Sequence, residues 1–318
     1  MKNNLCTLFD KNYLYKGIAL YNSIKKNCAN FTLWILCMDD KTFKVLSELN
    51  LDNTKLLKLS DIEDEVLISL KKTREVSEFS WICKSYLLEY IFINNKNISS
   101  ITYLDSDTYF FSSPNKLFEN LKNSSIIITP HNFPSKIIHW ENTIGKYNAG
   151  VIILKNNKTA RKCLSYWKKE CVKECVRKKA GDQLYLNEWV NLYPNVYENK
   201  DKGVNLGPWN LLNYKIINKN NKIYIDNDLL TLFHFHGLKI FSKEYFYPAS
   251  NYNLQKKIIK LIYSPYYNEL KKVIYDVKII DKDFNFGIVK KPSLYNKIKK
   301  IVKNLIKFYD SNRKWNNS

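Results

Sequence analysis

The residues with the clearest capacity for chemistry are two carboxylates one residue apart, Asp105 and Asp107, in the stretch ITYLDSDTYFFSSP. They follow an apolar, β-branched run that is typical of a buried strand. Two carboxylates at such a strand end repel each other, and a divalent cation held against a diphosphate would compensate, since Mg²⁺ and Mn²⁺ prefer carboxylate oxygens. A solvated turn is the alternative, because a D-x-D tripeptide alone is a weak signal.

The segments before this pair alternate between strand and helix patterns. Apolar runs predict strands at 3–10, 31–38, 54–60 and 101–107, and helical spacing of apolar residues predicts helices at 13–27, 40–50, 61–72 and 81–94, with Asp40 as an N-cap. This alternation predicts an α/β fold with a mostly parallel sheet and helices on both faces. Ligands bind outside the carboxyl ends of such strands, which is where Asp105 and Asp107 lie.

After Asp107 the alternation is less regular. Further strands are predicted at 124–131, 147–157 and 221–237, and helices at 159–179 and 182–193. We expect one domain at 1–255, with two parts at about 1–110 and about 111–255. A basic helical extension is expected at 256–318.

The charge balance favours anionic partners. The chain of 318 residues has 51 Lys and Arg against 30 Asp and Glu, a formal net charge of +21. Nucleic acid, an anionic membrane and phosphorylated small molecules all fit this charge, and a solvated surface in a Lys-, Asn- and Ile-rich proteome is the alternative. No known nucleic-acid-binding module accompanies the charge, so we expect no nucleic-acid partner.

The cysteines and the apolar runs indicate a reducing compartment. Cys171 and Cys175 lie on one predicted helix face with no nearby His, so we expect reduced core cysteines rather than a zinc site. No apolar run resembles a signal peptide or is long enough to span a bilayer. The sequence predicts a cytoplasmic protein, with attachment to the inner face of the plasma membrane left open.

The C-terminal stretch from Lys290 to Ser318 combines apolar residues at helical spacing with many lysines. This pattern is typical of a basic amphipathic helix on an anionic membrane. A helix packed on the domain with its lysines outward is the alternative.

Several short motifs occur in an order that resembles a known family. They are TLFDKNY at Thr7–Tyr13, the D-x-D pair, YNAGVIIL from Tyr147, AGDQLYLN from Ala180, NLGPWN at Asn205–Asn210 and HFHGLKIF from His234. The chain resembles GT-A fold glycosyltransferases that use nucleotide-sugar donors. It is similar to the glycogenin/galactosyltransferase type (family 8) and to bacterial enzymes of surface-polysaccharide synthesis, over most of residues 4–241.

The resemblance implies that 1–255 is a GT-A catalytic domain, with a donor-binding part at about 1–110 and a sugar and acceptor part at about 111–255. It also implies roles for individual residues. The implied donor contacts are Thr7, Leu8, Tyr13, Lys84, Asp105, Ser106, Asp107, Ala149, Gly150, Gly237 and Lys239, and the implied sugar and acceptor contacts are Asn148, Asp182 and Gln183. Asp105, Asp107 and His234 match the family's ligands for Mn²⁺ or Mg²⁺, with His236 as the competitor of His234. Arg74 is a looser donor candidate, and an N-cap is the alternative for Asp182.

The implied reaction moves a hexose-type sugar, with UDP as the default nucleotide, to a glycan or lipid-linked acceptor. Retention of anomeric configuration is implied by the resemblance. The sequence secures no nucleophile, so front-face attack and double displacement both stay open. A catalytically silent nucleotide-sugar-binding scaffold and a nucleic-acid-binding protein are the alternative functions.

Overall fold

The computed structural model describes residues 2–177, 181–249, 252 and 254–290. The predicted membrane-binding helix at 291–318 lies outside these residues. In the described part of the chain, none of the helices has the length and apolar character needed to cross a membrane.

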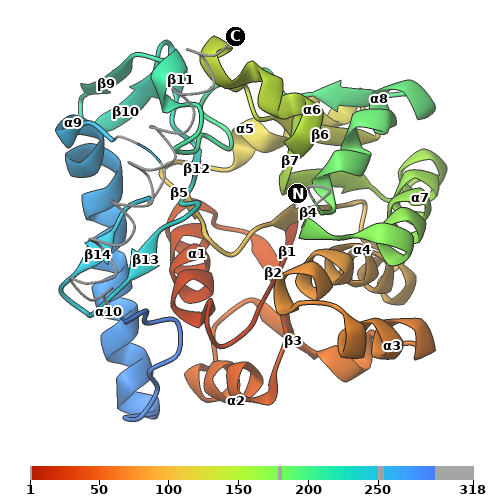
Figure 1. Cartoon of the computed structure of the whole chain (residues 1–318), viewed down its shortest axis with the longest axis horizontal. Coiled ribbons are helices and arrows are strands. Elements are labelled where there is room, and N and C mark those ends of the chain that lie inside the picture. Colours follow the sequence, from red (N-terminus) through yellow and green to blue (C-terminus); the bar gives the residue numbers. More distant parts are fainter. Residues whose placement is uncertain (1, 178–180, 250–251, 253, 291–318) are drawn as a thin grey trace, which may run out of the picture.

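A seven-stranded sheet forms the centre of the molecule, in the order β3-β2-β1-β4-β7-β6-β8 (Figure 1). Its strands are β1 (Asn3–Phe9), β2 (Phe31–Cys37), β3 (Thr54–Lys58), β4 (Ser100–Leu104), β6 (Ile126–Pro130), β7 (Tyr147–Lys155) and β8 (Val196–Glu198). The first four in this order are parallel, and β7 runs antiparallel to β4 and β6. The predicted α/β fold with a mostly parallel sheet is confirmed.

Helices cover both faces of the sheet, as Figure 1 shows. One layer contains α1 (Leu14–Asn27), α2 (Asp40–Leu49) and α10 (Ser264–Ile280), and the other contains α3 (Glu65–Thr73), α4 (Val76–Asn94) and α7 (Lys158–Glu174). Alternate strand residues face opposite layers, because successive side chains of a strand point to opposite faces. On β1, Leu5 and Phe9 enter one core and Cys6 and Leu8 the other.

Short elements complete the chain. They are β5 (Thr108–Phe110), α5 (Asn115–Phe118), α6 (Glu141–Ile144), α8 (Trp189–Leu192), β9 (Ile216–Lys219), β10 (Lys222–Ile225), β11 (Asp228–Leu229), β12 (Leu232–His234), β13 (Lys239–Ile240), β14 (Phe246–Tyr247) and α9 (Lys256–Ile258), with 3₁₀ turns between some of them. β12 pairs antiparallel with β5, which places His234 opposite Thr108, directly after the D-x-D pair.

Several helix starts differ from the sequence predictions: α3 starts at Glu65 rather than at 61, and α4 starts at Val76 rather than at 81. The N-cap of α2 is Asp39, whose Oδ1 accepts a hydrogen bond from the backbone N–H of Thr42 at 2.8 Å, whereas Asp40 is the first helical residue. Both acids suit the helix start, and the backbone conformation selects the first of them. The region predicted as one helix at 182–193 is a 3₁₀ turn (Gln183–Glu188) followed by α8, and the side chain of Asp182 does not cap it.

The segment after α10 returns to the N-terminal part of the chain. The hydroxyl of Tyr15 on α1 donates to the backbone oxygen of Phe284 at 3.1 Å. The side chains of Tyr266, Leu270 and Val273 on α10 are fully buried. Residues 264–290 are therefore part of the same core as β1 and α1.

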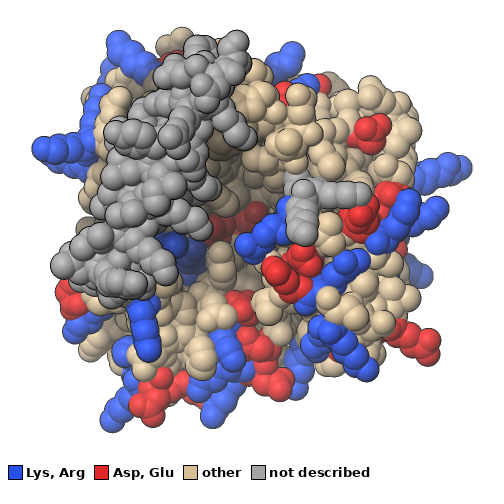
Figure 2. Space-filling model, in the orientation of Figure 1, with Lys and Arg blue, Asp and Glu red and all other residues tan. Residues whose placement is uncertain are grey.

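Charged side chains are spread over the face shown in Figure 2, with acidic surface visible deep in a hollow near its centre. The seven cysteines are all buried and free, which agrees with the expectation for Cys171 and Cys175.

Candidate active site

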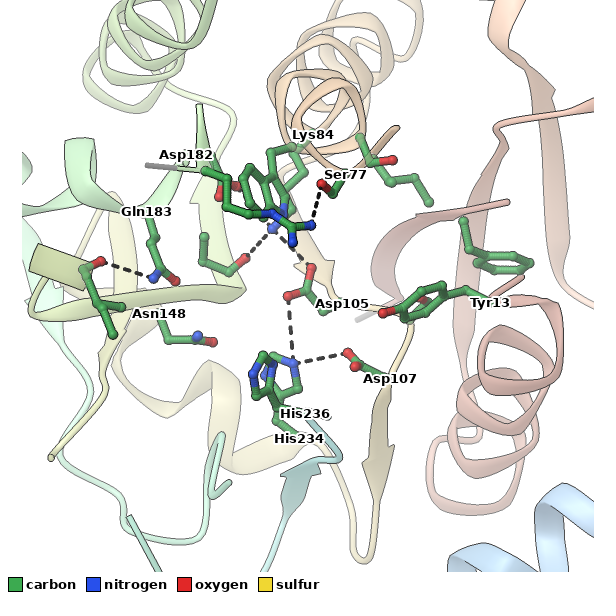
Figure 3. A pocket seen from close by; sticks show the side chains of 18 of the residues that line it. Tyr13, Ser77, Lys84, Asp105, Asp107, Asn148, Asp182, Gln183, His234 and His236 are labelled. Carbon is green, nitrogen blue, oxygen red and sulfur yellow. Dashed lines mark hydrogen bonds and ion pairs between the residues drawn. The ribbon is translucent and has the colours of Figure 1, made fainter. Parts of the chain in front are cut away.

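Three potential metal ligands converge at the carboxyl end of β4. One ligand atom from each of Asp105, Asp107 and His234 lies within 4.8 Å of the others. His234 Nε2 is 3.0 Å from Asp107 Oδ1 and 3.8 Å from Asp105 Oδ2, as Figure 3 shows. His236 is not part of this group, and its ring centre lies 6.2 Å from that of His234, so the geometry supports His234 as the ligand.

The two oxygens of Asp105 have different partners. Oδ1 accepts a hydrogen bond from the hydroxyl of Tyr103 at 3.0 Å and lies 3.1 Å from Lys84 Nζ. Oδ2 is the oxygen on the His234 side. Because Oδ1 is fully engaged, the carboxylate is oriented with Oδ2 toward the position that a cation would take.

A chain of buried hydrogen bonds fixes the tautomer of His234. The backbone oxygen of Gly145 only accepts, so His131 Nδ1 donates to it at 3.1 Å and His131 Nε2 accepts from the Asn148 amide at 3.2 Å. Burial lowers the pKa of His131 to about 3, which keeps this ring neutral. Asn148 Oδ1 accepts from the Asn205 amide at 2.9 Å, which turns the Asn205 oxygen toward His234.

This chain of hydrogen bonds determines which ring nitrogen of His234 carries the proton. Its Nδ1 lies 3.3 Å from Asn205 Oδ1 and must donate there, since that oxygen only accepts. In the neutral ring Nε2 then carries the free lone pair and faces the two carboxylates. Two carboxylate oxygens and one imidazole nitrogen with this polarity fit a Mn²⁺ or Mg²⁺ ion.

Lys84 balances the charge of the site. Its Nζ lies 3.0 Å from Asp182 Oδ2 and 3.1 Å from Asp105 Oδ1, and its side chain is 5% exposed. Burial lowers the pKa of Lys84, but the two carboxylates outweigh burial and hold the pKa above its ordinary value. Lys84 is therefore a buried permanent cation.

The metal-ligand group is electrostatically coupled. Burial raises the pKa of Asp107, but His234 and Lys16 lower it more, so it stays below its usual range. Burial lowers the pKa of His234, but Asp107 and Asp105 raise it more. Without a cation, a proton on His234 partly compensates the two carboxylates, so protons and metal compete for this site.

A family model described as nucleotide-diphospho-sugar transferase matches residues 31–198, more than half of the chain. The chain belongs to this family. Of the relatives of this transferase, YfnF of Bacillus subtilis (strain 168), an uncharacterized protein, is 30% identical over 296 residues, covering 90% of this chain and 97% of YfnF. YfnD of the same strain, also uncharacterized, is 27% identical over 292 residues, covering 90% and 94%.

Solved structures show that the transferase has the GT-A fold. The galactosyltransferase LgtC, in complex with donor and acceptor sugar analogs, superposes with a TM-score of 0.56 at 14% identity, covering 85% of this chain and 95% of that one. An active-site mutant of LgtC gives a TM-score of 0.59 at 13% identity, covering 90% and 100%. The predicted nucleotide-sugar glycosyltransferase class is confirmed.

The transferase has a cavity of about 870 Å³ in front of the candidate metal ligands. Most of the residues predicted for the site line it, namely Leu8, Tyr13, Lys84, Asp105, Ser106, Asp107, Asn148, Ala149, Asp182, Gln183, His234 and His236. Figure 3 shows Asn148 and Gln183 on one side of the metal-ligand group and Tyr13 on the other. The Gln183 amide donates to the backbone oxygen of Ile144 at 3.0 Å, which fixes its orientation.

Five predicted residues do not line this cavity. Gly237 and Lys239 line a neighbouring cavity. Gly150 is packed behind the site, where a Cβ atom would lie 2.6 Å from Asn148 Oδ1 and 2.7 Å from the His234 ring, so only glycine lets these two groups approach. Thr7 is fully buried within β1, and its donor role stays a prediction. The looser candidate Arg74 ends α3.

Sequence reasoning missed several residues of the site. Tyr103 and Asn205 were part of quoted stretches but received no role of their own, and His131 and Lys16 were passed over. The available signal for His131 is its place at the end of β6, next to the strand that carries Asn148. Lys16 resembles an ordinary helix lysine, and only its burial in the structure, 7% exposed, distinguishes it.

Proposed function

We propose that this transferase moves a hexose-type sugar from a UDP-sugar to a glycan or lipid-linked acceptor, with Mn²⁺ or Mg²⁺ bound, in the synthesis of a bacterial surface polysaccharide. The observation that carries the proposal is the convergence of Asp105, Asp107 and His234 beside a large cavity. The opposite wall of that cavity carries amide and carboxylate groups suited to sugar hydroxyls.

On the donor side, Tyr13 would stack on the base, with Leu8 beside it. A divalent ion held by Asp105, Asp107 and His234 would bind the diphosphate and neutralise the charge that develops as this group leaves. Lys84 would keep Asp105 oriented, and Gly237 and Lys239 would contact the phosphates from the neighbouring cavity. Charge neutralisation of the departing UDP is the main catalytic effect in this scheme.

On the sugar side, Asn148, Asp182 and Gln183 would orient the transferred sugar and the acceptor. Asp182 is 3% exposed and is held by Lys84, so it presents a fixed oxygen pair rather than a mobile side chain. The donor and acceptor sugar analogs present in the LgtC complex support one cavity for both sugars. The proposal includes transfer with retention of the anomeric configuration, by front-face attack or by double displacement.

The test measures release of free UDP from a panel of UDP-sugars with Mn²⁺ or with EDTA. We expect turnover with Mn²⁺, its loss in EDTA, and a decrease of about a hundredfold or more for Asp107→Asn in a variant that still unfolds cooperatively in urea. UDP binding without any UDP release would instead support the catalytically silent scaffold. Equal turnover with Mn²⁺ and EDTA would contradict the metal role.

The net charge of +21 keeps one other function open, the binding of nucleic acid. A filter-binding assay with duplex and single-stranded probes tests it. We expect weak, salt-sensitive retention, and tight retention at physiological salt would favour this alternative.

We further propose a cytoplasmic location with the 291–318 tail on an anionic membrane. The support is the sequence pattern of the tail, because these residues lie outside the described part of the chain. Truncation after Pro292 should abolish co-sedimentation with phosphatidylserine vesicles. Full binding by the truncated chain would remove the tail from this role. The division between 1–255 and 256–318 stays a prediction.

A further inference from the structure

A second cavity, of about 520 Å³, lies next to the large one and shares Asn12 and Tyr13 with it. Three lysines line it, namely Lys16 from α1, Lys239 from β13 and Lys290 from the segment after α10. The described part of its lining contains no acidic residue. Cationic side chains from three separate parts of the chain face one space. Such a space favours an anion.

Lys16 is the unusual member of this set. It is 7% exposed, and its Nζ lies 3.9 Å from Asp107 Oδ2, which is too far for a hydrogen bond. The same Nζ lies 4.3 Å from the centre of the Tyr13 ring. Within the described residues the ammonium group has no hydrogen-bond acceptor, although it carries three donors. Burial of such a group is costly unless a further partner completes its contacts.

The helix that carries Lys16 adds to this positive potential. α1 has 14 residues, and its N-cap, Tyr13, makes no side-chain capping hydrogen bond. No acid is present in its first turn. The N-terminus of a helix attracts anions and disfavours a lysine, so a buried lysine in this turn indicates an anionic ligand.

The outer wall of the cavity is held in place by the C-terminal segment. The backbone N–H of Val289 donates to the backbone oxygen of Ile240 at 2.7 Å. Gly287 packs against the backbone oxygen of Asn12, where a Cβ atom would clash. This wall keeps Lys290 at the cavity, although its side chain is exposed.

We propose that Lys16 is a ligand of the donor's diphosphate, bound between the metal ligands of the large cavity and the lysines of the second cavity, with Lys239 and Lys290 as the other cations. The inference rests on the proposed function, because it needs a nucleoside diphosphate in the large cavity. Tyr13 and Asp107 border the space that a nucleotide would cross, and Lys16 contacts both. The ammonium group of Lys16 would exchange its long contact with Asp107 for hydrogen bonds to phosphate oxygens.

The experiment compares the affinities of uridine, UMP and UDP at saturating Mn²⁺ by isothermal titration calorimetry. We expect Lys16→Met to weaken UDP binding about tenfold or more and uridine binding less than twofold, since a lost charge-assisted hydrogen bond acts on the phosphates alone. Lys16→Arg should recover part of the loss. Lys290→Met should weaken UDP binding less than Lys16→Met, because Lys290 is exposed. The control is Lys26→Met, which removes an exposed lysine from the other end of α1 and should change none of these affinities.

A second measurement separates phosphate binding from an effect through Asp107. Lys16→Met removes a positive charge beside a metal ligand, so Mn²⁺ alone should bind as tightly as to the wild type or more tightly, measured by electron paramagnetic resonance. A parallel loss of Mn²⁺ and UDP affinity would show that Lys16 acts only through Asp107 and would overturn the inference. An unchanged ratio of UDP to uridine affinity would overturn it as well. Failure of the wild type to bind UDP at all would remove the proposed donor and this inference together.

Discussion

Replacement of Lys84 by methionine tests the charge balance of the site most directly. The ammonium group lies 3.0 Å from Asp182 and 3.1 Å from Asp105, and Asp182 is 3% exposed. Lys84→Met leaves a buried carboxylate without its cation. Loss of one partner of a buried ion pair typically costs about 3–5 kcal/mol, a large part of the total stability of a domain.

The stability cost of Lys84→Met should depend on Asp182 and on pH, which makes this prediction specific. With Asp182→Asn also present, the buried carboxylate is gone and only Asp105, whose side chain is 24% exposed, loses its cation. The double variant should therefore lose about 2 kcal/mol less stability than the two single variants lose when their costs are added. In Lys84→Met alone, the pKa of Asp182 rises further above its unfolded value. Such a carboxyl destabilises the fold as pH rises above about 3.9, so the cost should shrink as the pH is lowered from 7 to 5.

Urea unfolding at pH 7 and pH 5, with the m-values compared, measures these effects. Lys25→Met is the matched control, because Lys25 pairs with Asp52 at 2.7 Å on the solvated surface and its replacement should cost far less stability than Lys84→Met. Equal midpoints for Lys84→Met and Lys25→Met would refute the reasoning. The reasoning would also be refuted if the stability lost by the double variant equals the sum of the losses of Lys84→Met and Asp182→Asn within about 0.5 kcal/mol.

Two further predictions concern the hydrogen-bond chain behind His234. Asn205→Leu removes the acceptor for His234 Nδ1 and should weaken Mn²⁺ binding about 10- to 100-fold, measured by electron paramagnetic resonance without substrate. Asn205→Asp keeps an acceptor and should retain most of the affinity. A leucine variant that binds Mn²⁺ as tightly as the wild type would contradict the tautomer assignment. His131 has a pKa of about 3 in the fold because it is buried, against about 6.5 when unfolded, so between these values each unit of acidification should destabilise the wild type by up to about 1.4 kcal/mol. His131→Gln lacks this titration, so its stability in urea should fall less than that of the wild type from pH 6.5 to 4.5. Parallel curves of stability against pH for the two proteins would contradict the lowered pKa of His131.

The sequence predicted the parts of the fold that depend on local pattern. The apolar runs of β1, β2 and β4 are buried on both faces of the sheet, and such runs need no knowledge of their neighbours to be recognised. The carboxyl end of β4 follows from the same pattern, which is why Asp105 and Asp107 were placed correctly at a strand end. The start of α2 was misplaced by one residue, because Asp39 and Asp40 both fit the helix start.

The parts that could not be predicted depend on contacts between distant segments. The hydrogen-bond chain from Gly145 to His234 joins four segments, and no spacing in the sequence reveals their proximity. The resemblance marked Asn148 as a sugar contact, but the structure also makes it a link between His131 and Asn205. Lys16 is buried where α1, β13 and the C-terminal segment line one cavity, and these three segments are far apart in the sequence.

The packing of residues 284–290 on the first turn of the chain has a consequence for biosynthesis. Asn12 and Tyr15 leave the ribosome long before Gly287 and Phe284, which they contact. The wall that supports the turn at Asn12 is therefore missing until residues 284–290 have been made. A nascent chain that stops near residue 255 would have the candidate metal ligands but not this wall, so we expect it to acquire its full affinity for a nucleotide only when residues 284–290 have been added.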